Sequence, residues 1–242
     1  MEIKQFANDL DAIETFVFKT PLSSGTSIFE SFEERFDVKR DHEDFLYIPG
    51  KRADAVLLVA HVDTVWQHHR GNFFGPPQIE IEDGIARSKT KYVGIGADDR
   101  AGVAMIWQLA DLGHSILLTD KEEIGMIGAR TAMKLIGNEL QNHQFMVSFD
   151  RMGYTDFKCY DVGTDEFRDY MMKSLSGFKE PDRRSYSDIV TLARDICAVN
   201  LSTCYFEEHT QFESLDMEGW KLNLDTYRKW LSQPLQKFER TI

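Results

Sequence analysis

Long hydrophobic runs are missing from this sequence of 242 residues. A helix that crosses a bilayer needs about 18 to 20 consecutive apolar residues, and no stretch approaches that length. The N-terminal stretch MEIKQFANDLDAIETFVF carries acids early and lacks the basic start and unbroken apolar segment of a secretory signal. We therefore expect no membrane partner and a cytoplasmic location.

Cysteine and positive charge are also scarce. The three cysteines, Cys159, Cys197 and Cys204, include no Cys-x-x-Cys pair, which argues against a disulfide framework and against a thiolate zinc site. The 28 basic residues are outnumbered by 40 acidic ones, giving a formal net charge of -12. Binding to a phosphate backbone needs clustered positive charge, so we expect no nucleic acid partner.

The hydrophobic pattern predicts the fold class. Short Val- and Leu-rich runs alternate with amphipathic segments, which is typical of an α/β fold: a three-layer α/β/α sandwich with a mixed, mostly parallel central sheet. We expect residues 1–242 to form one domain. Residues 78–89 alternate in hydrophobicity around Asp83-Gly84, which indicates a β-hairpin. The other predicted strands are 44–50, 55–63, 115–120, 145–150, 157–162 and 197–202, and the predicted helices are 1–20, 26–36, 99–112, 126–141, 163–175, 187–195 and 219–236.

Polar side chains follow the predicted strands where each of them ends. In open α/β sheets the ligand site lies at the carboxyl edge of the strands. The residues delivered to that edge are His and carboxylates: His61, Asp63, Glu122, Glu123, Asp150 and His209. The run GIGADDRAGVAMI adds Asp98 and Asp99 where a helix begins. One of these two aspartates is explained as a helix cap, but a cap does not need both.

Each of these residues also has a plain structural explanation. His61 alone fits a hydrogen-bonded core histidine, Asp98 alone fits a cap, and an exposed Glu pair fits a solvated face. The set as a whole is better explained as a metal site, because imidazole and carboxylate are the ligands of catalytic zinc and related ions. His68 and His69 are adjacent, and we expect them to be exposed rather than ligands.

Five motifs in this order, HVDTV, GADDRAG, EEIG, SFD and EEHT, resemble the co-catalytic dizinc exopeptidase superfamily. That superfamily includes leucyl-type aminopeptidases, peptidase T and amino-acid deacylases. The short interval from Asp150 to His209 resembles the compact branch, which has no inserted lid or dimerisation domain. Within that branch Cys204 stands where relatives tend to have glycine.

The resemblance implies two zinc ions per chain, with Co²⁺ or Mn²⁺ as possible replacements. It implies that Asp98 bridges the ions, that His61 and Asp150 complete one site, and that Glu123 and His209 complete the other. It further implies a catalytic pair: Glu122 as the general base for a metal-bridging water, and Asp63 as the carboxylate that orients His61. A cis peptide bond is implied between Asp98 and Asp99, with Asp99 capping the helix.

The substrate is less clearly indicated. The resemblance favours an aminopeptidase that hydrolyses an amide bond in peptides. A dizinc deacylase acting on N-acyl amino acids stays open, as does a non-catalytic metal-binding protein, and the oligomeric state is not predicted. Candidate substrate contacts are Arg151, Tyr186, Ser187 and Tyr205, and Asp188 lies in the same run.

Overall fold

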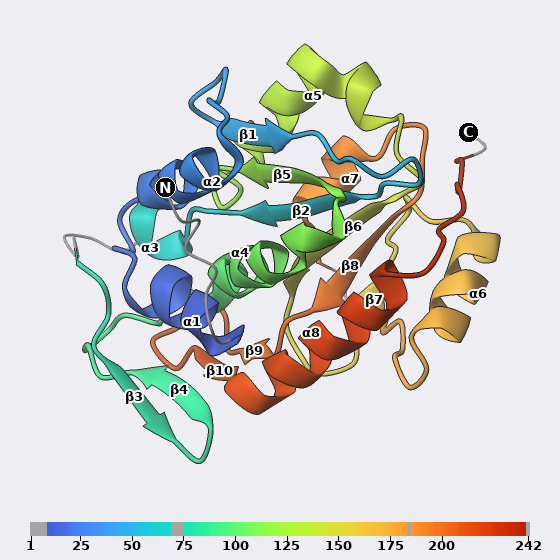
Figure 1. Ribbon diagram of the computed structural model, residues 1–242. Helices are drawn as coiled ribbons and strands as arrows, with labels where there is room; N and C mark the ends of the chain where they lie inside the picture. Colours follow the sequence, from blue (N-terminus) through green and yellow to red (C-terminus); the bar gives the residue numbers. More distant parts are fainter. Residues whose placement is uncertain (1–8, 69–74, 183–184, 241–242) are drawn as a thin grey trace.

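A six-stranded sheet forms the centre of the molecule in the computed structural model, which describes residues 9–68, 75–182 and 185–240 (Figure 1). Its four inner strands are parallel and its two edge strands are antiparallel to their neighbours, which confirms the predicted mixed, mostly parallel sheet. The strand order is β1 (Phe45–Ile48), β5 (Ser115–Thr119), β2 (Leu57–His61), β6 (Met146–Arg151), β8 (Ala198–Ser202) and β7 (Phe157–Lys158).

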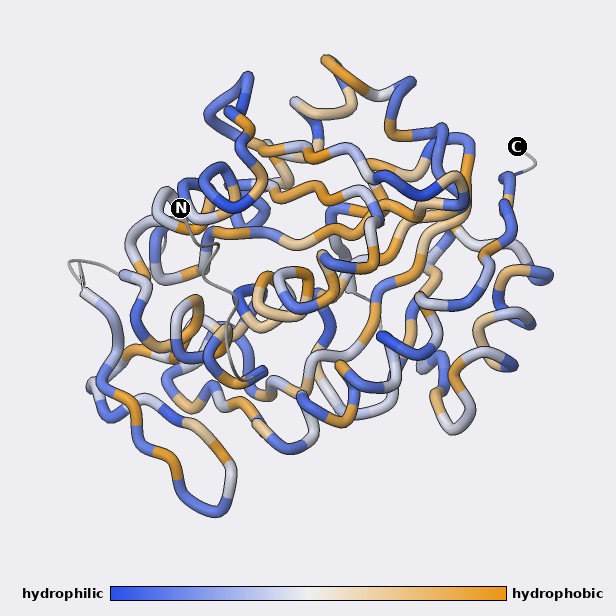
Figure 2. The backbone as a smooth tube through the Cα atoms, viewed as in Figure 1, coloured by the Kyte–Doolittle hydropathy of each residue, from blue (hydrophilic) through white to orange (hydrophobic). Residues whose placement is uncertain are grey.

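The hydrophobic pattern of β2 explains why the sheet is covered on both faces. Successive side chains of a strand point to opposite faces. Leu58 and Ala60 belong to one hydrophobic cluster, whereas Leu57 and Val59 belong to another. All of them are buried, as expected for a central parallel strand. Figure 2 shows the hydrophobic residues concentrated in the central strands.

Helices lie on both faces of the sheet (Figure 1). On one face α4 (Ala97–Leu109) packs against β2 and β6, and α1 (Asp9–Ile13) and α8 (Met217–Leu231) pack against α4. On the other face α7 (Asp188–Leu192) packs against β2, β6 and β8, and α5 (Ile127–Leu140) covers β1. The remaining helical segments are the π-helix η1 (Glu14–Phe18), α2 (Thr26–Phe36), α3 (Val65–His68), the 3₁₀ turn η2 (Ala110–Leu112) and α6 (Asp165–Ser174).

A second, antiparallel sheet confirms the predicted hairpin. Its strand order is β3 (Ile79–Glu82), β4 (Ile85–Ser88), β10 (Ser214–Asp216) and β9 (Tyr205–Phe206). The sequence does not reveal β9 and β10, because each is too short to show an alternating pattern. The loop between them carries His209, so this small sheet holds one of the predicted ligands.

Several predicted elements differ in extent from the observed ones, most clearly in three places. Strand β7 is much shorter than the predicted run 157–162, and Tyr160 within that run has a φ of 50°, which no strand uses. Helix α8 ends before the predicted 236, because Pro234 disfavours helical backbone at the residue before it. Of the helix predicted over 1–20, residues 1–8 lie outside the described residues.

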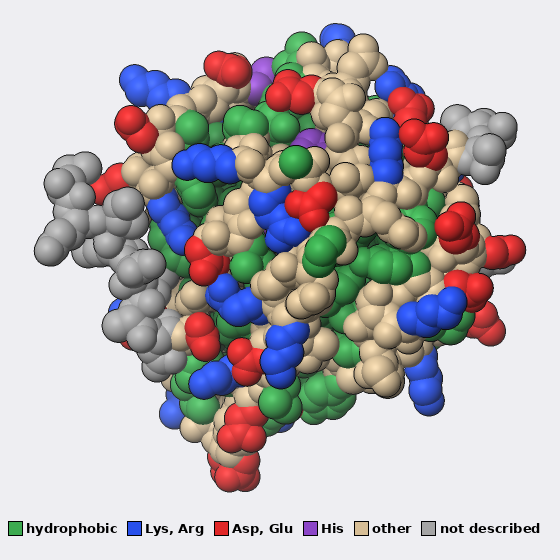
Figure 3. Space-filling view, turned by 45° about the vertical axis from the view of Figure 1, so that its right-hand side comes forward, with side chains coloured by type: hydrophobic (Ala, Val, Ile, Leu, Met, Phe, Trp, Pro, Cys, Tyr) green, Lys and Arg blue, Asp and Glu red, His purple; other side chains and the backbone are tan. Residues whose placement is uncertain are grey.

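The segment between Asp150 and His209 contains β7, α6, α7, β8 and β9; β7 and β8 belong to the main sheet and β9 belongs to the second sheet. The single-domain interpretation stays a prediction. Among the described residues, no helix has the length and apolarity needed to cross a membrane. On the face seen in Figure 3, acidic and basic side chains are interspersed.

Candidate active site

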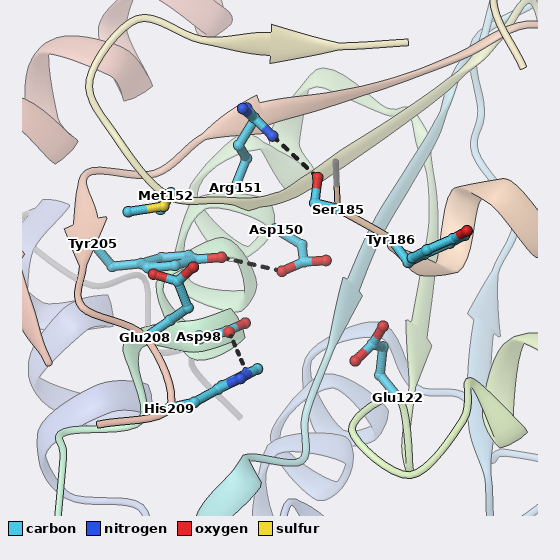
Figure 4. A pocket seen from close by; sticks show the side chains of 10 residues that line it. All are labelled: Asp98, Glu122, Asp150, Arg151, Met152, Ser185, Tyr186, Tyr205, Glu208 and His209. Carbon is cyan, nitrogen blue, oxygen red and sulfur yellow. Dashed lines mark hydrogen bonds and ion pairs between the residues drawn. The ribbon is translucent and has the colours of Figure 1, made fainter. Parts of the chain in front are cut away.

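The predicted polar residues meet at the carboxyl edge of the main sheet. His61 is the last residue of β2, Glu122 and Glu123 follow β5, and Asp150 lies near the end of β6. His209 arrives from the loop between β9 and β10. A cavity of about 250 Å³ opens here, and its lining includes Asp98, Glu122, Asp150, Tyr205 and His209 (Figure 4).

Asp98 lies between two histidines. Its Oδ1 is 3.3 Å from Nε2 of His61, and its Oδ2 is 3.1 Å from Nε2 of His209. Asp150 completes the first group, with its Oδ1 3.8 Å from Nε2 of His61. Glu123 completes the second, with its Oε2 3.1 Å from Nε2 of His209. The structure thus brings together all five predicted metal ligands, in two groups that share Asp98.

The charge of this cluster fits divalent cations. Hydrogen bonds to Asp98 and Glu123 raise the pKa of His209 to about 11, and burial raises the pKa of Asp150 to about 7. Asp98 is only 8% exposed, and among the described residues its buried Oδ1 accepts no well-formed hydrogen bond, although it lies 3.3 Å from Nε2 of His61. Three carboxylates and two imidazoles pointing at one another are stabilised by a metal ion, which replaces protons that the site would otherwise hold. The residues present therefore fit two cations that share Asp98.

The Asp63 carboxylate contacts both His61 and the turn that carries Glu122 and Glu123. It is fully buried, and its Oδ1 lies 3.3 Å from Nδ1 of His61, which also contacts the Asp63 backbone oxygen at 3.1 Å. The backbone N–H groups of Glu122 and Glu123 donate to the same carboxylate at 3.1 and 3.2 Å. One carboxylate thus contacts both His61 and the Glu122-Glu123 turn, and the orienting role of Asp63 stays a prediction.

His68 is a partner that the sequence analysis missed. Its Nε2 lies 3.0 Å from Oδ2 of Asp63, and its side chain is 14% exposed. The expectation that His68 is an exposed residue is therefore wrong. The contact depends on α3, a four-residue helix too short to be recognised by periodicity, which turns His68 back onto Asp63. His69 lies outside the described residues.

Glu122 points into the cavity from the side opposite His209 (Figure 4). Burial raises the pKa of its carboxyl to about 9, with nearby carboxylates adding to the effect and His61 opposing it. A carboxyl group in such a place can hold a proton, and cations bound next to it would favour its release. Its position is suited to general acid-base chemistry.

The two adjacent aspartates make separate contacts. The peptide bond between Asp98 and Asp99 is cis, which confirms the expectation from the resemblance. The expectation that Asp99 caps the helix is not met, because Oδ2 of Asp99 instead accepts a hydrogen bond from the backbone N–H of His61 at 3.1 Å. Asp99 therefore fastens the start of α4 to the end of β2.

Glu213 supports the same turn from the other side, and no sequence motif indicated it. Its side chain is 1% exposed and accepts hydrogen bonds from the backbone N–H groups of Gly96, at 2.8 Å, and Asp98, at 3.0 Å. These bonds satisfy two buried donors of the loop that presents Asp98.

The candidate substrate contacts divide into two groups. Arg151, Tyr186 and Tyr205 line the cavity, and the Tyr205 hydroxyl donates to Oδ1 of Asp150 at 3.3 Å. Ser187 and the neighbouring Asp188 are buried and are not among the cavity-lining residues. Asp188 accepts a hydrogen bond from Thr119 at the end of β5.

Cys204, which stands where compact relatives tend to have glycine, has a φ of 63°. This is the left-handed region that glycine adopts readily. The loop leading to Tyr205 and His209 therefore keeps a glycine-like backbone despite the side chain.

Comparisons with known proteins agree with this geometry. The sequence model described as Peptidase family M28 matches residues 45–194. None of the curated proteins matches the chain.

Several solved structures have the same fold. Aminopeptidase PepT from Bacillus cereus ATCC 10987 is 13% identical, with a TM-score of 0.64 over 93% of this chain and 98% of that one. Aminopeptidase APDkam598 from the archaeon Desulfurococcus kamchatkensis is 12% identical, with a TM-score of 0.63 over 94% and 95%. The TET1 peptidase of Pyrococcus horikoshii is 11% identical, with a TM-score of 0.67 over 94% and 100%.

Proposed function

Because the chain belongs to peptidase family M28, and is therefore a metallopeptidase, we propose that it is an aminopeptidase that removes the N-terminal residue of peptides with two divalent metal ions, preferably zinc. The observation that carries the proposal is the shared position of Asp98 between the groups of His61 and His209. The choice of substrate is supported by two proteins of similar structure, PepT and APDkam598, which are both aminopeptidases.

The metal ions would be held by His61, Asp98 and Asp150 on one side, and by Asp98, Glu123 and His209 on the other. When bound, such ions polarise the scissile carbonyl group and lower the pKa of water. The chain supplies the proton transfers. Glu122 takes a proton from the attacking water and returns it to the amine that leaves.

Asp63 contributes by holding its neighbours. By accepting from Nδ1 of His61, it keeps Nε2 of that ring free of a proton and directed toward Asp98 and Asp150. By accepting from the backbone of Glu122, it fixes the turn that aims the Glu122 side chain at the cavity. The acid-base group and the ligands are therefore held by the same buried carboxylate.

The proposal is tested by measuring hydrolysis with a panel of substrates after loading the purified protein with Zn²⁺, Co²⁺ or Mn²⁺. The panel consists of free peptides, aminoacyl anilides and N-acyl amino acids. We expect metal-dependent release of N-terminal residues from the peptides. Faster hydrolysis of N-acyl amino acids would assign a deacylase instead. Bound metal without hydrolysis of any substrate would indicate a non-catalytic metal-binding protein. The cytoplasmic location stays a prediction.

A further inference from the structure

Arg151 stands out in the cavity as a permanent positive charge among carboxylates. The acidic side chains in the cavity lining are Asp98, Glu122, Asp150 and Glu208. Arg151 is the last residue of β6 and directly follows the predicted ligand Asp150. In Figure 4 the Asp150 carboxylate lies in the cavity, where the Tyr205 hydroxyl contacts it, whereas the Arg151 side chain points away from Asp98 and His209, toward Ser185.

The hydrogen bonds of Arg151 do not use the capacity of its guanidinium group. The side chain is only 4% exposed. Nη1 donates to Oγ of Ser185 and Nη2 donates to Oδ2 of Asp156, both at the long distance of 3.3 Å. Within the described residues, the buried Nε has no hydrogen-bond partner. A guanidinium group has five N–H donors, and a buried donor without an acceptor is unfavourable.

A structural function alone does not explain these contacts. If Arg151 served only to tie β6 to Asp156, short and well-aligned bonds would be expected, because paired charges form N–H···O contacts of about 2.7 to 2.9 Å. Asp156 is also 34% exposed, so part of its interaction is with solvent. The guanidinium group is thus buried in the cavity wall, and its Nε–H can still donate a hydrogen bond to a further acceptor.

From this geometry we infer that Arg151 binds a carboxylate of the substrate, on the residue that leaves. The inference rests on the proposed aminopeptidase function. The planar fork of the guanidinium group matches a carboxylate, which is the anion that every short peptide carries at its C-terminus. In a dipeptide that group lies one residue beyond the scissile bond. The substrate class is therefore short peptides with a free C-terminal carboxylate, dipeptides above all.

The part of the cavity beside Arg151 adjoins a second hollow. The cavity of about 250 Å³ has Arg151, Ser185 and Tyr186 in one part of its lining. Ser185 and Tyr186 also line a neighbouring hollow of about 560 Å³, which offers space to a substrate that continues beyond Arg151. A carboxylate held at Arg151 ends the substrate before that point.

The test compares three substrates that share the best N-terminal residue X of the panel: the dipeptide X-Gly, its C-terminal amide, and X-Asp α-amide, which carries its carboxylate in the side chain. We expect kcat/KM for X-Gly to exceed that of X-Gly amide by about 10- to 100-fold, the usual value of a hydrogen bond to a charged group. Equal activity on X-Asp α-amide and X-Gly would show that a side-chain carboxylate serves as well.

Arg151→Gln should reduce the ratio of X-Gly to X-Gly amide to near one, and Arg151→Lys should give an intermediate ratio because it keeps the charge without the fork. The matched control is Arg194→Gln, which removes an exposed ion pair with Asp195 away from the cavity and should keep the wild-type ratio. The ratio is a readout that a purely structural function of Arg151 would not change.

Two results would overturn the inference. The wild-type protein could hydrolyse X-Gly and its amide equally well, a comparison that needs no folded variant, or Arg151→Gln could keep the wild-type ratio. Either would leave the aminopeptidase function intact. If the metal-loaded wild-type protein hydrolysed none of the peptides, the proposed function itself would fail, and the inference with it.

Discussion

Glu122 and Glu123 are neighbours in the chain, yet their side chains face different partners. Glu123 contacts Nε2 of His209, whereas Glu122 points into the cavity. Glu122→Gln should therefore keep both metal ions and lose about 10²- to 10⁴-fold in kcat, because an amide cannot take up the proton. Glu123→Gln should weaken the second metal site, and excess metal should restore part of the activity. Metal titration and turnover of both variants check this prediction, and loss of a metal only in Glu122→Gln would reverse the two functions.

His68 extends the hydrogen-bond chain behind His61, since it donates to Asp63 on the side away from that ring. Removing a partner behind a metal ligand usually costs about 10- to 100-fold in affinity. We expect Asp63→Ala to lower metal affinity by that amount and His68→Ala to lower it less. His68→Gln should recover part of the loss, because its amide can still donate a hydrogen bond. Competition with a chelator measures the affinities. Unchanged metal affinity in His68→Ala would show that His68 does not support the metal site through Asp63.

Residues that follow buried strands of the main sheet could be predicted from the strand pattern, whereas Asp98 and His209 were indicated by their motifs. His61, Glu122, Glu123 and Asp150 come directly after hydrophobic runs, so their common location follows from the sheet. Glu213 and His68 were not predicted. Glu213 directly precedes β10 and His68 ends α3, and these two elements have too few residues to show a periodic pattern. Glu213 contacts Gly96 and Asp98, which are far from it in the sequence, and His68 contacts Asp63 within an irregular loop.

At the scale of single elements, α4 must approach β6 closely to bring Asp98 beside Asp150. Gly102 allows this approach, because a Cβ atom at this position would lie 2.6 Å from the backbone oxygen of Phe149. Gly102→Ala should therefore reduce the free energy of unfolding by about 1 to 3 kcal/mol.

Gly137 in α5 is the matched control. A Cβ atom there would meet only the flexible end of Met133, at 3.4 Å. Gly137→Ala should be neutral or stabilising by up to about 1 kcal/mol, because alanine has the higher helix propensity. Urea unfolding of both variants measures the difference. Equal effects of the two substitutions would contradict the close packing of α4 on β6.

At the scale of the whole molecule, His114 joins the start of the central sheet to the end of the C-terminal helix. Its Nδ1 accepts from the backbone N–H of Val56 at 3.3 Å, and its Nε2 donates to the backbone oxygen of Leu231 at 3.0 Å. Only the neutral ring can do both. Burial lowers the pKa of His114 to about 4.

The unfolded chain therefore binds a proton at His114 between pH 6.5 and 4, where the folded chain does not. This contribution to stability is complete above pH 6.5 and is lost as the pH falls toward 4. Between pH 7 and pH 5 it amounts to about 2 kcal/mol. His114→Asn, which can accept and donate in the same places, should lose that much less stability than the wild type over this interval. Parallel pH dependence of unfolding in the two proteins would contradict the prediction.

The general architecture was also predictable at this scale, because the sequence directly displays the continuous apolar run of a buried strand such as β2 and the helical period of an amphipathic helix such as α2. Of the second sheet, only the hairpin formed by β3 and β4 could be predicted from the sequence. Its other two strands form because β10 pairs with β4 across a large sequence separation, and such pairing leaves no local trace.

The central claim is that two metal ions share Asp98. Anomalous X-ray diffraction at the zinc absorption edge, from crystals of the zinc-loaded protein, tests it most directly. We predict two separate peaks, one in contact with His61 and Asp150 and the other with Glu123 and His209, with Asp98 contacting both. A single peak, or peaks that do not contact Asp98, would contradict the account.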